Sequence, residues 1–430
     1  MFKYFKICFV ISVILSASCL LTAAEETLSW QDCVKEAQKN NPELISALAV
    51  VGQRKAAKSI TASDLYPQIA ATVSGSTAKT GKGDSSSTTA AGTRDSYSYG
   101  ASGTQLIFDG MQTVNNVGAA SENLSASKEA YRFTSASIRF DLRTAFVNLL
   151  KAQELVRVAE EIIKIRRDNL VLITLRYESG LEHKGALLTA EANMAQANSE
   201  LSQAKRSVDF AQWQLMKEMG RDAFAAVSVS GDFIVSDRAQ DKPDFEIIIE
   251  KNPSVLEAAA RKNSASFGIK SAYGAFLPEL SGTASANKSS SHWPPETGNW
   301  SAGLNLSMPI FEGGLKFAEL EQAKALYDQR KSDEKNVRNS ALVSLQETWA
   351  ALQDTLENVE VSFKSLKAIE ERSKIAQAQY STGFIGFDDW IIIEDDLVSA
   401  KKAYLETQAN ALFAEADWIQ AKGETLEYAQ

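Results

Sequence analysis

The chain repeats its own landmarks. Four of them occur twice in the same order: Asn41-Pro42 and Asn252-Pro253, Leu65-Tyr66-Pro67 and Phe276-Leu277-Pro278, Phe108-Asp109-Gly110 and Phe311-Glu312-Gly313, and Tyr177-Glu178-Ser179-Gly180 and Tyr380-Ser381-Thr382-Gly383. The first two recur 211 residues later and the last two 203 residues later, so one copy has a longer segment between 67 and 108. Landmarks repeated in a fixed order predict two copies of one structural unit.

The first 24 residues predict export. Lys3 and Lys6 precede an apolar run over 7–21, and three small residues follow before two glutamates. This is the order of a secretory leader, and the run is shorter than the roughly 20 residues that span a bilayer. We therefore expect a signal peptide over 1–24, cleaved near Ala24. Lipidation of Cys19 is the alternative.

Composition excludes several classes of function. The net charge is −9, and no basic cluster interleaved with aromatic residues is present, which argues against nucleic acid as a partner. Two of the three cysteines lie in the leader, so no disulfide framework is expected. His183 and His292 are the two histidines, and no nucleophile, phosphate-binding or metal-ligand motif accompanies them. We expect no enzyme, cofactor or metal site.

Two stretches carry a heptad pattern without proline. The first seam consists of Ile138, Leu142, Ala145, Leu149, Ala152, Val156, Ala159 and Ile163, and the second of Leu342, Leu345, Trp349, Leu352, Leu356, Val359, Phe363 and Leu366. Such seams predict long helices in coiled-coil packing. Gly180 and Gly383 then act as stops, and the helical pattern resumes over 187–219 and 397–422. Each copy is therefore predicted to form a helical hairpin.

Helix lengths support this arrangement. A helix of about 67 residues is about 100 Å long, whereas the returning helix of about 40 residues reaches only about 60 Å. A second helix must complete each return. We expect it over 245–276 in the first copy and, for the second copy, over 28–65.

Four segments have strand character: 67–80, 96–108, 278–287 and 299–311. In the clearest case one face carries Trp300, Ala302, Leu304, Leu306, Met308 and Ile310. This alternation is typical of membrane β-barrel strands with about 10 residues in the bilayer, although a half-buried soluble strand has the same period. No later stretch resembles a transmembrane helix, so membrane contact would have to use strands.

Turn-rich links over 79–94 and 288–298 predict surface loops between antiparallel strands, the first loop being the longer one. Tyr97, Tyr99, Trp293 and Trp300 flank the links. These residues form either an aromatic girdle or ordinary strand aromatics.

Four strands cannot close a membrane barrel, because the smallest use about eight and lipid does not tolerate an open edge. Three copies supply about twelve strands. The expected fold is mostly α with membrane β: long α-helical coiled-coil hairpins form an α-barrel, and four strands per chain contribute to a trimeric 12-stranded membrane β-barrel. The expected domains are the leader over 1–24, a first repeat over 25–220, an equatorial connector over 221–242 and a second repeat over 243–430.

These features resemble the TolC-like outer-membrane efflux proteins over essentially the whole mature chain. The resemblance rests on the two Asn-Pro helix starts, the two Leu/Phe-x-Pro strand entries, the two Phe-Asp/Glu-Gly exits and the two Tyr-x-x-Gly tips. It implies a homotrimeric channel in the outer membrane that extends into the periplasm. Such a channel is a passive exit duct for efflux or type I secretion, recruited by an inner-membrane pump through a periplasmic adaptor protein.

The resemblance also implies that the tips line the periplasmic entrance and dock the adaptor. The docking candidates are Tyr177, Ser179, Gly180, Leu181, Tyr380, Gly383 and Phe384. The alternative is that the two glycines are merely helix stops.

An acidic cluster follows the second tip. Asp388-Asp389 and Asp395-Asp396 are seven residues apart, so both pairs return to one helical face. In a trimer they would form a carboxylate ring that selects or binds cations, whereas a solvated acidic face is the alternative. The family often has an acid six residues after the second-tip glycine, which Asp389 matches, but Ile392 stands where a second acid is expected.

Some members of the family hold the closed state through polar links between the hairpins. Tyr380 occupies a link position, but Ala186 stands in place of the expected acid and Ile385 in place of the expected base. The familiar network is thus absent or rebuilt. Arg176, His183 and Lys184 near the first tip are either new contacts or exposed tip charges.

A soluble periplasmic coiled-coil adaptor is the main alternative class, because it also needs long helical hairpins. It would have one hairpin, a lipoyl-like module and no paired strands of membrane type. The duplicated hairpins and strand pairs favour the channel.

Overall fold

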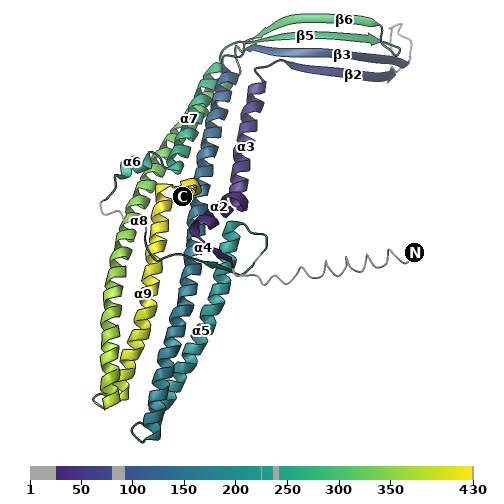
Figure 1. Ribbon diagram of the computed structural model, residues 1–430. Helices are drawn as coiled ribbons and strands as arrows, with labels where there is room; N and C mark the ends of the chain where they lie inside the picture. Colours follow the sequence, from purple (N-terminus) through teal and green to yellow (C-terminus); the bar gives the residue numbers. More distant parts are fainter. Residues whose placement is uncertain (1–25, 80–92, 224, 236–241, 429–430) are drawn as a thin grey trace, which may run out of the picture. The chain divides into compact units, whose positions relative to one another are not determined.

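The computed structural model describes residues 26–79, 93–223, 225–235 and 242–428, so the leader predicted over 1–24 lies outside it. The chain forms two compact units (Figure 1). The hairpin unit comprises Met1–Ser46, Arg132–Ile249 and Ala341–Gln430, and the strand unit comprises Ala47–Tyr131 and Glu250–Ser340. Each unit is drawn from both sequence repeats, and the predicted repeat boundaries at 220 and 243 stay a prediction.

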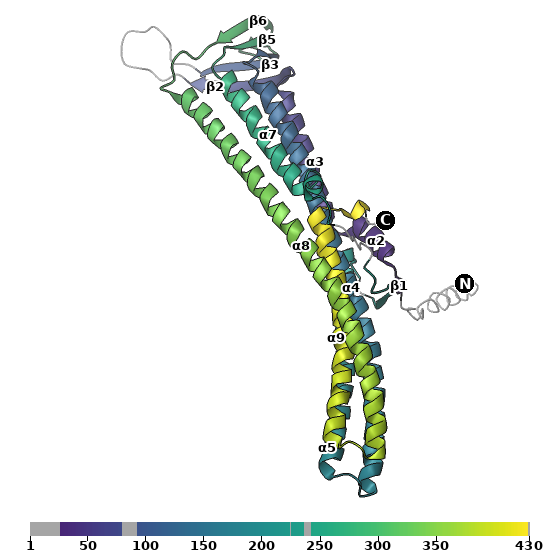
Figure 2. The same cartoon turned by 90° about the vertical axis from the view of Figure 1, so that its left-hand side faces the viewer.

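Two helical hairpins dominate the hairpin unit. The first pairs α4 (Gln112–Glu178) with α5 (Lys184–Met219), and the second pairs α8 (Leu315–Thr382) with α9 (Phe387–Lys422) (Figure 1, Figure 2). The stop glycines have left-handed backbones, with φ of 70° at Gly180 and 83° at Gly383. Both predicted hairpins are confirmed, because glycine adopts this conformation without strain from a Cβ atom.

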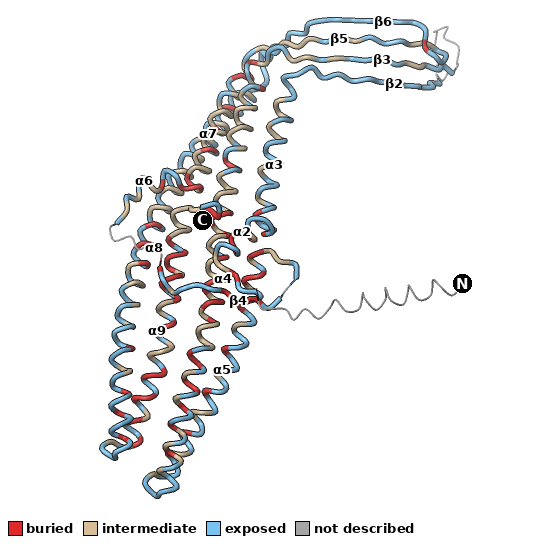
Figure 3. The backbone as a smooth tube through the Cα atoms, viewed as in Figure 1, coloured by how far each residue is buried: buried red, intermediate tan, exposed pale blue. Residues whose placement is uncertain are grey.

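The two heptad seams differ in how well they are covered. Seven of the eight predicted positions in α4 are buried, and Val156 is half-buried (Figure 3). In α8 four of the eight are buried, whereas Leu342, Leu356 and Val359 are half-buried and Phe363 is 44% exposed. The second hairpin is therefore open along part of its core.

The two accessory helices are broken where one helix was expected. The segment 28–65 forms α2 (Trp30–Asn40) and α3 (Pro42–Ser63), and 245–276 forms α6 (Phe245–Ile249) and α7 (Pro253–Gly274). Pro42 and Pro253 lack the N–H that a continuing helix needs, but they fit a first helical turn. The amide oxygen of Asn41 accepts hydrogen bonds from the backbone N–H groups of Glu43 and Leu44, at 3.0 and 3.1 Å, and so starts α3. The expectation of single helices was wrong at these prolines.

A short parallel pair was not predicted. β1 (Glu26–Leu28) pairs with β4 (Val227–Val229) in the hairpin unit. It joins the start of the described chain to the segment that follows the first hairpin.

The strand unit contains a four-stranded antiparallel sheet in the order β2-β3-β5-β6. Its strands are β2 (Gln68–Lys79), β3 (Thr93–Phe108), β5 (Glu279–Ser290) and β6 (Thr297–Ser307). β6 ends before Pro309, which has no N–H for a ladder bond. Met308 and Ile310, expected in this strand, therefore lie outside it.

The pairing register gives the sheet two chemically different faces, because residues directly opposite each other on neighbouring strands point to the same face. One face carries mainly apolar side chains: Ile69, Ala71, Val73, Tyr97, Tyr99, Ala101, Ala284, Ala286, Trp300, Ala302, Leu304 and Leu306. The other carries mainly polar ones: Thr72, Ser74, Ser98, Ser102, Thr104, Thr283, Ser285, Asn287, Ser301 and Asn305. The predicted alternation is confirmed.

The apolar face is uncovered in a single chain. Ile69 is 79% exposed, Val73 74% and Trp300 82%, and most residues of the four strands are exposed (Figure 3). An apolar surface of this extent requires a nonaqueous neighbour. Among the described helices, no segment has the length and apolarity to cross a bilayer.

Candidate functional site at the hairpin tips

The two hairpin tips expose most of the predicted docking residues. Leu181 is 67% exposed, Phe384 83% and Tyr177 37%. Ser179, Gly180 and Gly383 are also exposed. The ring nitrogen Nδ1 of His183 accepts a 3.1 Å hydrogen bond from the N–H of Ala186 and so caps the start of α5.

Tyr380 is the exception, because it is fully buried. Its ring stacks on Trp390 with centroids 4.4 Å apart and planes at 6°. Its hydroxyl donates a hydrogen bond to Oε2 of Glu182 at 2.8 Å, which joins the second hairpin to the first tip. Burial raises the pKa of Tyr380, and the hydrogen bond and charge of Glu182 raise it further.

Arg176 completes this contact. Its guanidinium lies 4.6 Å from the centroid of the Tyr380 ring, and its Nη1 donates to the backbone carbonyl of Tyr380 at 3.2 Å. Its Nε lies 3.9 Å from Oε2 of Glu182. We name Arg176, Glu182 and Tyr380 the tip triad. The exposed-charge alternative was wrong for Arg176, whose side chain is 18% exposed, whereas His183 and Lys184 are exposed.

An apolar cluster explains why the expected acid at 186 is missing. Ala186 is fully buried in an apolar cluster to which all four long helices contribute residues. A carboxylate at this position would lose its hydration. The cluster contains Ile173, Ala186, Ala190, Ala376, Tyr380, Phe387, Trp390 and Ile393. Glu182, four residues earlier, provides the acid from the edge of this cluster instead.

A second set of polar contacts joins the hairpins farther from the tips. Nη2 of Arg166 lies 2.5 Å from Oδ1 of Asp395. The carboxylate of Glu394, 3% exposed, accepts hydrogen bonds from Ser373 Oγ at 2.6 Å and from Asn169 Nδ2 at 3.2 Å. Arg166 and Asn169 belong to α4 and the other three to the second hairpin. We name these five residues the upper link.

The four predicted gate aspartates are not equivalent. Asp395 pairs with Arg166, and Asp396 has a longer ion pair of 3.8 Å with Arg372. Asp388 and Asp389 are exposed in the first turn of α9, and neither forms an ion pair with any residue that the structure describes. The two pairs therefore separate into a free set and a paired set.

The predicted girdle residues gather at one end of the sheet. Trp293 lies 6.4 Å from Tyr97 and 6.2 Å from Tyr99, measured between ring centroids, in edge-on geometry. The register places Trp300 on the same sheet face as both tyrosines. Their role as a girdle stays a prediction.

Comparison with known proteins decides the family. The family model described as "Outer membrane efflux protein" matches residues 33–221 and 246–424. The chain belongs to this family. Its relatives include the outer membrane efflux protein BepC of Brucella suis, which is 22% identical over 98% of this chain and 91% of its own length.

Solved structures show the same fold for this efflux protein. A structure of CusC matches with a TM-score of 0.82 at 20% identity, over 93% of this chain and 95% of that one. The outer membrane protein VceC of Vibrio cholerae matches with a TM-score of 0.80 at 18% identity, over 92% of this chain and 96% of that one. The family match and the relatives make this efflux protein an outer-membrane exit duct reaching into the periplasm, so the soluble-adaptor alternative is wrong. Its family is one of transport channels rather than of enzymes.

Sequence reasoning singled out Tyr380 and the aspartates of this efflux protein but missed Glu182 and four residues of the upper link: Arg166, Asn169, Ser373 and Glu394. Glu182 had one available signal, an acid two residues after the stop glycine of the first tip. Glu394 and Asn169 had no such signal, because the sequence does not show that a carboxylate on one helix and an amide on another lie close together.

Proposed function

We propose that three copies of this chain form a trimeric outer-membrane duct whose periplasmic gate is built from the hairpin tips. The observation that carries the trimer is the sheet, in which β2 and β6 are outer strands and one face is apolar. Lipid does not tolerate open sheet edges, so β6 of one copy pairs with β2 of the next. Three sheets then give about twelve strands with the apolar face toward lipid and the polar face toward water.

The tip residues would dock a periplasmic adaptor protein that recruits an inner-membrane pump. The efflux role of the family supports this, and so does the exposure of Leu181 and Phe384 at the tips. Apolar side chains exposed on a helical turn provide contact area for a partner's helices. We propose efflux, the term in the family description, rather than type I secretion as the role of the duct.

The tip triad and the upper link would hold the gate closed. Both join the first hairpin to the second, so the hairpins cannot separate without breaking them. A hydrogen bond to a charged group contributes about 1.5–3 kcal/mol. An adaptor that binds the separated hairpins more tightly by a few kcal/mol is sufficient to shift the population toward the open state.

Asp388 and Asp389 would form the carboxylate ring in the trimer. Both are exposed and free of ion pairs with described residues, and they lie within one turn of the second tip. Three copies would concentrate six carboxylates at one level of the duct. A ring of this kind favours cations over anions.

Assembly is tested by charging each sheet face in turn. Trp300→Asp puts a carboxylate on the apolar face, where a charge is destabilising next to lipid, and Ser301→Asp is the matched control on the polar face. We expect the control to form heat-modifiable trimers that conduct in planar bilayers, and Trp300→Asp to fail in membrane assembly. Wild-type protein that stays monomeric in detergent, or equal assembly by both variants, would overturn the proposal.

A further inference from the structure

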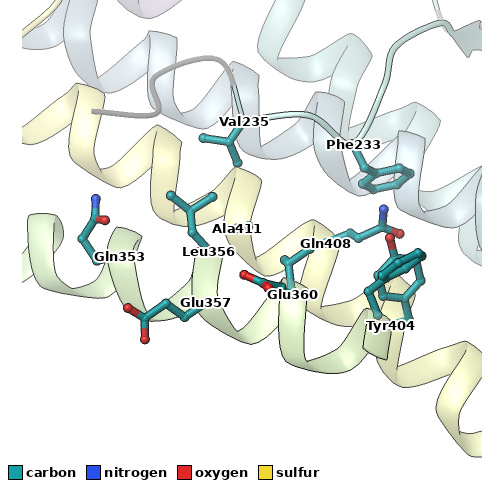
Figure 4. A pocket seen from close by; sticks show the side chains of 11 residues that line it. Phe233, Val235, Gln353, Leu356, Glu357, Glu360, Tyr404, Gln408 and Ala411 are labelled. Carbon is teal, nitrogen blue, oxygen red and sulfur yellow. The ribbon is translucent and has the colours of Figure 1, made fainter. Parts of the chain in front are cut away.

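The uncovered part of the α8 seam forms one wall of a cavity in the hairpin unit (Figure 4). The cavity has a volume of about 670 Å³. Leu356, Val359 and Phe363 contribute from α8, Tyr404 and Ala411 from α9. The segment after β4 covers it with Phe233 and Val235. The volume is within the range of small-molecule sites, about 300–1,000 Å³.

One end of the cavity is aromatic. The rings of Phe363 and Tyr404 have centroids 5.8 Å apart and are tilted by 47°. Figure 4 shows Phe233 on the covering segment above Gln408 and Tyr404, with Val235 farther along the cavity beside Leu356. Aromatic faces carry negative electrostatic potential and attract cations within about 6 Å of the ring centroid.

The charged lining is acidic. Glu357 and Glu360 line the cavity, and none of the other described lining residues is a lysine or an arginine. Glu360 accepts a 2.6 Å hydrogen bond from Lys364 Nζ, which compensates its charge. Glu357 is exposed and forms no ion pair with a described residue, so its charge is available to a ligand.

Two lysines near the aromatic end are themselves paired with carboxylates, and the first, Lys401, pairs with Glu161 at 3.2 Å. Lys367 Nζ lies 5.8 Å from the Phe363 ring centroid, but it also forms a 2.9 Å ion pair with Glu370. Among the described residues that line the cavity, Glu360 is paired with Lys364 and Glu357 has no ion-pair partner, so this lining carries one uncompensated negative charge. This combination disfavours anions and favours a ligand with one positive charge.

We propose that this cavity binds amphipathic organic cations, distinct from the gate and from the sheet. The apolar body of the ligand packs among Phe233, Phe363 and Tyr404, and its positive charge is attracted by Glu357 and by the aromatic faces. A neutral apolar compound fills the same walls but does not use the carboxylate. The described residues that line the cavity all belong to one chain, and none of them belongs to the proposed gate.

The probe is tetraphenylphosphonium, with tetraphenylborate as an anion of nearly the same shape. Equilibrium dialysis of the purified full-length protein in detergent, corrected for protein-free micelles, is expected to show saturable binding of the cation and none of the anion. We expect Glu357→Gln to weaken binding about tenfold, as loss of a charge contact worth about 1.4 kcal/mol requires. Tyr404→Leu, which retains apolar bulk without the ring, is expected to weaken it by at least as much.

The matched control is Asp354→Asn, an exposed carboxylate on the same helix that does not line the cavity. It is expected to bind the cation as the wild type does. The circular dichroism of every variant checks that the hairpins are folded. Equal binding by the wild type, Glu357→Gln and Tyr404→Leu would overturn the proposal, as would saturable binding of tetraphenylborate with similar affinity.

Discussion

The hydroxyl of Tyr380 donates a 2.8 Å hydrogen bond to Glu182, and this contact joins the two halves of the duplicated chain at their tips. The repeat equivalent of Tyr380 is Tyr177, which is 37% exposed, whereas Tyr380 is fully buried. Duplication therefore produced two similar hairpins with unequal tips. The second hairpin inserts its tyrosine between the hairpins, and the first leaves its tyrosine exposed.

Tyr380→Phe removes the donor to Glu182 but retains the ring stacked on Trp390. The lost hydrogen bond to a charged group is worth about 1.5–3 kcal/mol, so we expect the open probability to rise at least about tenfold. Single-channel recording in planar bilayers measures the change. Tyr177→Phe makes the same chemical change at the exposed equivalent and is expected to have no effect. Identical open probabilities in the two variants would contradict a gating role for Tyr380.

The raised pKa of Tyr380 predicts a specific dependence on pH. Burial and the neighbouring Glu182 disfavour the phenolate, so folding holds the proton on Tyr380 beyond the ordinary value of 10.0. The stabilisation is thus fully present below pH 10 and is lost as pH rises through the folded pKa. Ultraviolet titration at alkaline pH, as the difference between the wild type and Tyr380→Phe, should show no tyrosinate from this residue near pH 10. Ionisation of Tyr380 near pH 10 would contradict a buried hydroxyl that donates a hydrogen bond to Glu182.

The sequence predicted the elements whose signals are local and periodic. Each of these signals depends on residues of a single helix or strand. The structure contains all of them: the heptad seams, the stop glycines Gly180 and Gly383, and the strand alternation around Trp300. Pro42 and Pro253 each mark a helix start, yet we expected one helix over each of 28–65 and 245–276. The length argument required only that the helical residues of each segment add up to the missing length, so a break at the proline is compatible with it. The three-residue strands β1 and β4 are too short for any periodicity to appear.

Contacts between the hairpins could not be predicted in the same way. Whether Arg176 points to water or to Tyr380 depends on the rotation of α4 relative to α8, and the two residues are 204 positions apart. Likewise, Glu394 resembles any other acid of α9 until Asn169 and Ser373 are placed beside it. The family resemblance indicated a link at Tyr380, but its acidic partner is Glu182, and residue 186 is an alanine buried in the apolar cluster.

Glu394 is predicted to stabilise the contact between the hairpins. Glu394→Ala leaves the buried amide of Asn169 and hydroxyl of Ser373 without their acceptor, at a cost of about 1–3 kcal/mol each. We expect a lower thermal midpoint and faster hydrogen exchange in α4 and α9 near these residues. Glu191→Ala, at the exposed repeat equivalent on α5, is the control. A double-mutant cycle with Asn169→Ala should give a coupling of at least about 0.5 kcal/mol, and additive effects would argue against the link.

The buried cysteine offers a test of the packing around α2. Cys33 has no solvent exposure, and burial together with Glu36 and Asp32 raises the pKa of its thiol from 9.0 to about 12. The thiolate is the reactive species, so alkylation at pH 8 should be at least about a thousandfold slower than that of a free thiol. Peptide mass mapping after iodoacetamide treatment measures modification at Cys33 itself. Rapid labelling of the folded protein would show that α2 does not pack as described.

Asp389→Asn tests the carboxylate ring against a neighbour with the same charge. Asp389 has no ion-pair partner among described residues, so removing its charge should lower the cation preference of the duct and weaken block by divalent cations. Asp395→Asn removes an equal charge, but Asp395 is paired with Arg166 at 2.5 Å. We therefore expect Asp395→Asn to raise the open probability while leaving ion selectivity nearly unchanged. Reversal potentials under a salt gradient separate the two effects, and a selectivity that neither substitution alters would remove the ring from the mechanism.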